Sequence, residues 1–93
     1  MVQISWSDLA VEDLRSIYDY IAKDSAFYAK RQIARFIERT DQLIAFPEPG
    51  RVVPEFNDES LRELIEGNYR IIYSLGKGEV WIIRIHHAAR KIQ

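Results

Sequence analysis

A single cluster of proline and glycine, FPEPGRVVP at residues 46–54, divides the sequence into two halves with different hydrophobic periods. Before the cluster, apolar residues recur every three or four positions, as on one face of an α-helix. After it, apolar and polar residues alternate, which is typical of strands with one buried face. Because proline cannot continue a helix, the cluster ends the helical half. We therefore expect an α+β fold.

The two periodicities predict two helices and four strands, the first strand being short and N-terminal, all within one domain, residues 1–93. Helices are predicted over residues 7–23 and 25–46, since Ser7 and Ser25 can each cap a helix start. Two helices joined by so short a turn pack as an antiparallel hairpin. Strands are predicted over residues 2–6, 61–65, 69–75 and 80–87; the last three form an antiparallel meander, and both helices pack on one sheet face.

The turn between the last two strands determines which of their residues are paired. The segment Gly76-Lys77-Gly78 has the composition of a hairpin loop. A three-residue loop would place Leu75 opposite Glu79, and Arg70 opposite Arg84. We therefore expect cationic side chains to gather on one face of the meander, at the end away from this loop.

The same register predicts an apolar patch on that face, formed by Ile72, Val80 and Ile82. A solvated sheet face more often carries threonine, lysine and glutamate, so such a patch requires a cover. Two covers remain open: a loop or terminus of this chain, or a partner protein. If the cover is a partner, these three residues are its binding site.

The charge of the chain is close to balanced, with 13 basic and 14 acidic residues and a net charge of −1. Residues 1–60 hold seven basic and eleven acidic residues, whereas residues 61–93 hold six basic and three acidic ones. The strand half, at +3, would therefore face an anionic target more readily than the helical half, at −4. The absence of cysteine excludes disulfides and thiolate zinc sites. With no long apolar run, we expect a cytoplasmic protein with no membrane contact.

Two adjacent histidines, His86 and His87, are the most conspicuous polar residues near the end of the sequence. Adjacent residues of a strand point to opposite faces, so the two imidazoles would not chelate one metal ion. We therefore expect no metal site, and no motif in the sequence indicates a cofactor.

Four segments, in this order, resemble the RelE/ParE toxin family: WSDLAVEDLRSIYDYIAKDS, LIAFPEPGR, LRELIEGNYRIIYSL and VWIIRIHHAARKI. The resemblance runs nearly from end to end. It implies a strand, a two-helix hairpin and a mostly antiparallel sheet, as the periodicities do. It also implies the toxin of a type II toxin–antitoxin module, held inactive in a hetero-oligomer with a cognate antitoxin.

Two mechanisms occur in this family. RelE-like members cleave messenger RNA on the ribosome, whereas ParE-like members bind DNA gyrase and trap it on cleaved DNA. In a ribonuclease of this family, the resemblance implies that Arg70 stabilises the phosphate transition state. His86 or His87 would then exchange protons, and Arg90 is the nearest match to a second arginine.

We favour gyrase inhibition, because a pI near 6.1 is unlike the strongly basic ribosome-directed members and HHAAR is closer to the ParE side. This toxin would have no catalytic residues, and Arg70, Arg84, His86 and Arg90 would contact the target. The alternatives are a ribosome-dependent ribonuclease and a non-toxic member that only binds its antitoxin.

Overall fold

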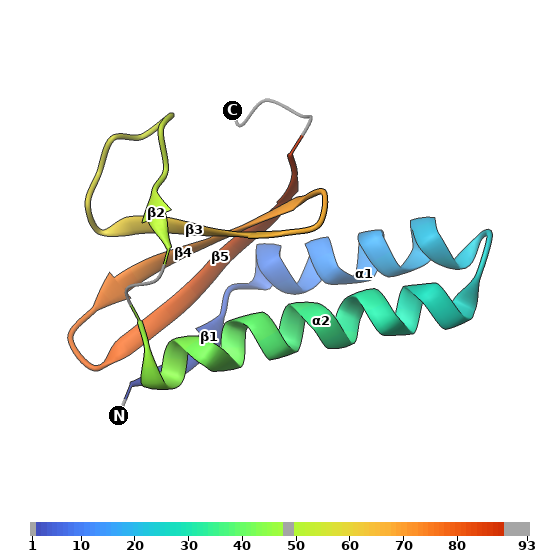
Figure 1. Ribbon diagram of the computed structural model, residues 1–93, viewed down its shortest axis with the longest axis horizontal. Helices are drawn as coiled ribbons and strands as arrows, with labels where there is room; N and C mark the ends of the chain where they lie inside the picture. Colours follow the sequence, from blue (N-terminus) through green and yellow to red (C-terminus); the bar gives the residue numbers. More distant parts are fainter. Residues whose placement is uncertain (1, 48–49, 89–93) are drawn as a thin grey trace.

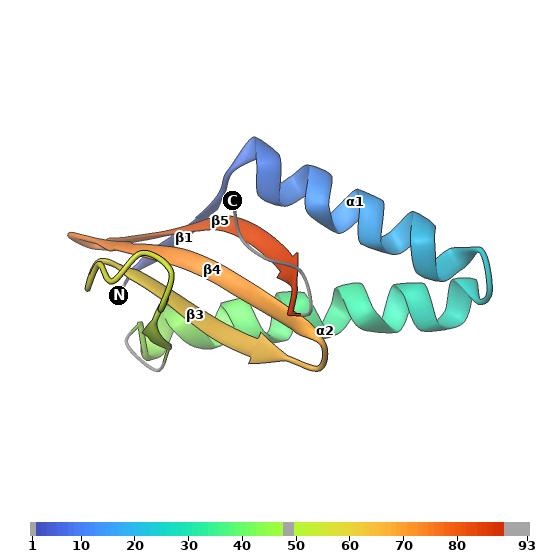
Figure 2. The ribbon, with the colours of Figure 1, turned by 90° about the horizontal axis from the view of Figure 1, so that it is seen from above.

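Two helices pack against one face of a five-stranded sheet in the computed structural model, which describes residues 2–47 and 50–88 (Figures 1 and 2). The strand order is β1-β5-β4-β3-β2. No helix in the described part of the chain is both long enough and apolar enough to cross a membrane. The elements are β1 (Gln3–Trp6), α1 (Asp8–Ala22), α2 (Ala26–Ala45), β2 (Arg51–Val52), β3 (Leu61–Glu66), β4 (Tyr69–Gly76) and β5 (Glu79–His87).

Both predicted helix starts are confirmed. The Ser7 hydroxyl accepts a hydrogen bond from the backbone N–H of Ala10 at 3.0 Å, and the Ser25 hydroxyl accepts one from Tyr28 at 3.2 Å. Each bond satisfies a backbone donor that has no partner within the first turn of the helix. The hairpin therefore begins at a fixed point on the sheet, and its inner face contributes Ala10, Ala29, Phe36 and Leu43 to the buried core.

The predicted meander of β3, β4 and β5 is also confirmed, but the sheet contains two pairings that the periodicities did not predict. β1 pairs in parallel with β5, and the two-residue strand β2 pairs antiparallel with β3. A parallel partner requires a long crossover, and the whole segment from α1 to β4 provides it. The sheet is therefore mixed, with the meander at its centre.

The turn between β4 and β5 is one residue shorter than expected. Gly76 is paired with Glu79, so the loop consists of Lys77 and Gly78 alone. Gly78 has a φ of 69°, a conformation that glycine adopts without the strain a Cβ atom would cause. The predicted pairing of Leu75 with Glu79 is therefore wrong.

A β-bulge then shifts the register of β5 by one residue. Tyr73 is paired with Ile82 and Ile72 with Arg84, so Ile83 is an extra residue on β5. A bulge of this kind changes which side chains face the core, because successive strand residues point to opposite faces. Before the bulge even-numbered residues of β5 face the helices, and after it odd-numbered ones do.

These two changes overturn the predicted patch of Ile72, Val80 and Ile82. Val80 and Ile82 are 0% exposed and belong to the core beneath the helices, whereas Ile72 is buried on the opposite face of the sheet. The three residues do not share a surface. The register also places Arg70 opposite His86 instead of the predicted Arg84.

The start of α1 continues along the edge of β5 where β1 stops. β1 ends at Trp6, and beyond it the Ser7 hydroxyl donates to the carbonyl oxygen of Ile83 at 2.7 Å. Further along, a carboxylate oxygen of Asp13 accepts from the backbone N–H of Ile85 at 2.9 Å. Side chains of the helical segment thus replace the backbone partners that a longer β1 would supply.

Candidate functional site

A network of four charged side chains lies on the sheet face away from the helices; we call this face the outer face and the cluster the outer-face network. Arg70 donates from Nε to Glu63 at 2.6 Å, and from Nη1 and Nη2 to the two oxygens of Glu55 at 2.6 and 2.8 Å. The second oxygen of Glu63 accepts from Nε of Arg51 at 2.6 Å. All three nitrogens of the Arg70 guanidinium are therefore engaged by carboxylates.

Strand register and a covering loop bring these residues together. Glu63 of β3 is paired with Ile72, and Arg70 precedes Ile72 by two residues on β4, so all three side chains lie on the outer face. Glu55 comes from the β2–β3 loop, residues 53–60, which lies at one end of the sheet on the side away from the helices (Figure 1). The cover of the outer face at Ile72 is thus supplied at least in part by this chain.

Burial makes the charge pairing necessary. Arg70 is 7% exposed and Glu63 is 1% exposed, and an unpaired charge at either position would be strongly unfavourable. The hydrogen bonds from Arg70 lower the pKa of Glu55 from its ordinary 4.5 to about 2. In turn, the hydrogen bonds to Glu55 raise the pKa of Arg70. The network thus pairs two guanidinium groups with two carboxylates, so that its formal charges balance.

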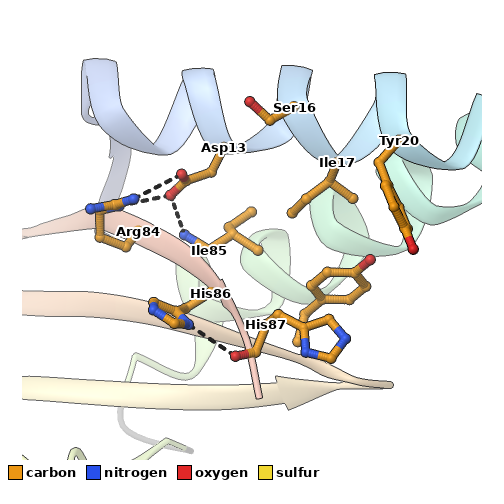
Figure 3. A pocket seen from close by; sticks show the side chains of 9 residues that line it. Asp13, Ser16, Ile17, Tyr20, Arg84, Ile85, His86 and His87 are labelled. Atoms are coloured by element: carbon orange, nitrogen blue, oxygen red, sulfur yellow. Dashed lines mark hydrogen bonds and ion pairs between the residues drawn. The ribbon is translucent and has the colours of Figure 1, made fainter. Parts of the chain in front are cut away.

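A pocket of about 540 Å³ lies between α1 and the last residues of β5 (Figure 3). Four of its residues come from one side of α1, four come from β5 after the bulge, and Tyr69 comes from the start of β4. The lining residues are Asp13, Ser16, Ile17, Tyr20, Tyr69, Arg84, Ile85, His86 and His87.

One end of this pocket is closed by an ion pair between α1 and β5. Arg84 donates from Nε and Nη2 to the two carboxylate oxygens of Asp13, at 2.9 and 3.0 Å (Figure 3). These hydrogen bonds raise the pKa of Arg84. Since Asp13 also accepts from Ile85, it joins the helix to both the side chain and the backbone of β5.

The two histidines also line the pocket and are held by different contacts. His86 places Nδ1 2.9 Å from the carbonyl oxygen of His87. The His87 ring meets the ring of Tyr69 edge-on, with centroids 5.4 Å apart. His87 is paired with Tyr69 and His86 with Arg70, so the two imidazoles belong to opposite faces of β5. Among the described residues no three His, Cys, Asp or Glu side chains are grouped as metal ligands would be.

The structure brings together only part of the predicted site. Arg84, His86 and His87 line the pocket, whereas the guanidinium of Arg70 lies in the outer-face network. Arg90 lies outside the described residues.

Sequence reasoning missed the three carboxylates that engage these arginines, Asp13, Glu55 and Glu63. The segment LRELIE carried a usable signal for one of them, because alternation puts Glu63 on the face opposite Leu64. No local pattern marked Asp13 or Glu55, since their partners are 71 and 15 residues away.

A family model and a relative identified by sequence both connect this chain to toxins of type II toxin–antitoxin systems. The family model for the ParE toxin of the type II toxin–antitoxin system parDE matches residues 4–92. The chain is 40% identical over 91 residues to Toxin RelE2 of Caulobacter vibrioides, an alignment that covers 97% of this chain and 99% of the relative.

Solved structures with low sequence identity show the same fold. The chain is similar to a structure of the chromosomal ParDE toxin–antitoxin system from P. aeruginosa, with a TM-score of 0.77, 23% identity, and coverage of 94% of this chain and 96% of that one. It is also similar to a chain of the archaeal RelE–RelB complex from Pyrococcus horikoshii OT3, with a TM-score of 0.65, 20% identity, and coverage of 97% and 98%.

Proposed function

Because this chain belongs to the RelE/ParE family of toxins of type II toxin–antitoxin systems, we propose that it is a ParE-like inhibitor of DNA gyrase that a cognate antitoxin neutralises. Its similarity to chains of solved ParDE and RelE–RelB systems supports a protein antitoxin as partner. The toxin acts by occupying a surface of its target and carries out no chemistry of its own.

The state of Arg70 is the observation that favours gyrase inhibition over RNA cleavage. In a ribonuclease of this family, the guanidinium at this position has to reach a phosphate oxygen in the transition state. Here Glu55 and Glu63 engage all three of its nitrogens, and the residue is 7% exposed. The side chain on which RNA cleavage depends is therefore already occupied within the folded chain.

The pocket between α1 and β5 is the proposed region of contact with gyrase. Of the four predicted contact residues, Arg84 and His86 line this pocket and remain in the proposal. Arg70 is no longer proposed as a contact residue, because Glu55 accepts hydrogen bonds from its guanidinium group. We expect His86 to contact the target directly, since it lines the pocket and its Nδ1 is held 2.9 Å from the carbonyl oxygen of His87.

A gyrase assay with purified toxin tests this function. We expect the antitoxin-free chain to block supercoiling and to accumulate cleaved DNA, and its antitoxin to reverse both effects. His86→Ala should weaken inhibition about tenfold, the typical cost of losing one good polar contact. Arg31→Ala, which removes an exposed charge on α2, is the matched control and should inhibit like the wild type. Growth arrest without any effect on gyrase would contradict the proposal.

One observation favours a RelE-like ribonuclease as the second candidate. Arg70 and His86 are direct cross-strand partners, which brings a guanidinium and an imidazole to neighbouring positions of the sheet. The 40% identical relative is named Toxin RelE2. Primer extension on messenger RNA after induction tests this candidate: codon-specific cuts that disappear in Arg70→Ala would support it. Normal growth with soluble antitoxin-free protein would instead indicate a member that only binds its antitoxin.

A further inference from the structure

We propose that the free end of the helix hairpin is an aromatic docking element, which inserts into an apolar groove of the same target protein that the pocket contacts. Three aromatic side chains lie there: Tyr20 in the last turn of α1, and Phe27 and Tyr28 in the first turn of α2. They are 71%, 67% and 60% exposed, and they are three of the four most exposed large apolar side chains among the described residues. We call these three residues the hairpin tip.

The fold does not require the rings of the hairpin tip. The turn that joins α1 to α2 lies at the end of the molecule away from the sheet in both views (Figures 1 and 2). None of the three residues belongs to the buried core beneath the helices. Aromatic residues also have a lower helix propensity than alanine, so they do not favour the helices that carry them. Neighbouring exposed apolar side chains of this kind mark a surface that contacts another molecule.

The hairpin tip has a fixed arrangement before any partner binds. The backbone N–H groups of Asp24 and Ser25 both donate to the carbonyl oxygen of Ile21 at 3.0 Å, which closes the turn. The Ser25 hydroxyl accepts from the backbone N–H of Tyr28 at 3.2 Å. The rings of Phe27 and Tyr28 meet edge-on, with centroids 5.3 Å apart. A partner therefore meets side chains that are already ordered, and binding costs less conformational entropy.

The size of the hairpin tip argues against a second copy of this chain as its partner. An aromatic side chain buries about 200 Å² when it is fully covered, and about two-thirds of each of the three is exposed. Two copies that met at their tips would therefore bury about 400 Å² each. A stable interface buries about 800 Å² on each partner. The hairpin tip is thus one part of a larger contact surface.

The remainder of this surface is the pocket between α1 and β5, because Tyr20 belongs to both. Tyr20 lines the pocket together with Arg84 and His86, the two residues proposed to contact gyrase (Figure 3). One protein that covers the pocket and the hairpin tip together would bury more than either surface alone. Aromatic side chains are typical anchors of such interfaces, and they bind in apolar pockets of the partner. We therefore assign the hairpin tip to a groove of the target protein.

The test measures the affinity of purified gyrase for the immobilised antitoxin-free toxin by surface plasmon resonance. Phe27→Ala removes one ring from the hairpin tip, and Phe27→Tyr keeps the ring. Phe46→Ala is the matched control, because Phe46 is 70% exposed and lies at the opposite end of α2. The hydrogen bond that caps α2 uses a backbone N–H group, and alanine has the highest helix propensity, so Phe27→Ala should unfold like the wild type. Tyr28→Ala serves as a second variant if Phe27→Ala does not fold.

We expect Phe27→Ala to bind gyrase about 30-fold more weakly than the wild type, the effect of losing an aromatic anchor of an interface. Phe27→Tyr and Phe46→Ala should bind like the wild type. Equal affinities for Phe27→Ala and Phe46→Ala would overturn the proposal. A loss of affinity for the antitoxin without a loss for gyrase would also overturn it, because the antitoxin would then be the occupant. Self-association of the wild type that Phe27→Ala abolishes would contradict it in favour of a second copy.

This inference rests on the proposed function, and growth arrest after induction separates the failure of one from the failure of the other. If the wild type and Phe27→Ala inhibit gyrase equally, the assignment of the hairpin tip is wrong and the proposed function stands. If the wild type does not bind gyrase, the proposed function is wrong. In that case, relief of growth arrest by Phe27→Ala but not by Phe46→Ala would support docking of the hairpin tip on a different target protein, and arrest by both variants would overturn it.

Discussion

Glu63 is a carboxylate in the interior of the sheet, and its two arginine partners explain how it can be charged there. An isolated buried carboxylate would be protonated or would destabilise the fold. Arg51 and Arg70 each donate to a different oxygen of Glu63 at 2.6 Å, so both carboxylate oxygens are hydrogen-bonded to a guanidinium group. Glu55 then balances the second arginine from the loop. The four residues act as a unit, because the loss of any one of them removes an ion-pair partner from another.

The pKa of Glu55 predicts how acid affects the fold. Because this pKa lies near 2 in the folded chain and near 4.5 in the unfolded one, the unfolded chain binds the proton first as the pH falls. The stabilisation by Glu55 is therefore complete above pH 4.5 and is lost progressively towards pH 2. Urea unfolding of the wild type and of Glu55→Gln should show a stability difference that narrows over this range. A difference that stays constant from pH 5 to pH 3 would contradict the assigned pairing with Arg70.

At the scale of the elements, β5 shows how much of the structure the sequence could predict. The alternation of apolar residues was sufficient to place the strand, and the same pattern correctly assigned the two faces of β4. It could not reveal the extra residue at Ile83, because Val80, Trp81, Ile82 and Ile83 are all compatible with a core position. The position of a bulge depends on how the strand packs against its partner strand and the covering helix, and the composition of a single strand does not predict this packing.

The bulge gives opposite predictions for two neighbouring residues. Ile82 is fully buried beneath the helices, whereas Trp81 is 44% exposed on the outer face. Ile82→Asp places an unpaired carboxylate in the core and should unfold the chain, or cost about 4 kcal/mol or more. Trp81→Asp should cost far less and leave a cooperative fold. Thermal and urea unfolding of both variants measures the difference; equal losses would mean that the register of β5 is misassigned.

A similar limit applies to the site. The sequence marked its basic residues and its histidines, because these types are conspicuous near the end of the last strand. It did not mark Asp13, which reaches Arg84 and Ile85 only after α1 is laid along β5. Long-range pairing of a helix carboxylate with a strand is a product of the tertiary fold, so no local pattern predicts it.

In the whole molecule, β4 and β5 are the most enclosed strands. β4 lies between β3 and β5, and its residues Ile71 and Tyr73 are 0% exposed, whereas β2 has two residues at one margin of the sheet. Most long-range contacts therefore converge on the centre of the sheet. The pocket at the end of β5 and the β2–β3 loop lie towards its periphery.

Hydrogen exchange should be slowest in the central strands and faster in the loop at the periphery of the sheet. We expect the backbone amides of Ile71, Tyr73 and Ile82 to exchange only through global unfolding, and those of the β2–β3 loop to exchange through local opening of a few kcal/mol or less. Exchange measured by NMR over a range of denaturant concentrations distinguishes the two. Loop amides as protected as those of β4 would contradict this difference between the loop and the central strands.

The way α1 begins also has a consequence for how copies of the chain behave towards one another. A strand edge with free N–H and carbonyl groups is a template for pairing with another molecule, and soluble proteins cover such edges. Along the second half of β5, Ser7 and Asp13 already bond to the groups that another strand would use. Side chains of the α1 segment thus protect this edge against sheet-to-sheet aggregation. Asp13→Ala should expose the edge and cause self-association, which light scattering detects. Asp19→Ala, on the exposed side of the same helix, is the control and should not cause self-association.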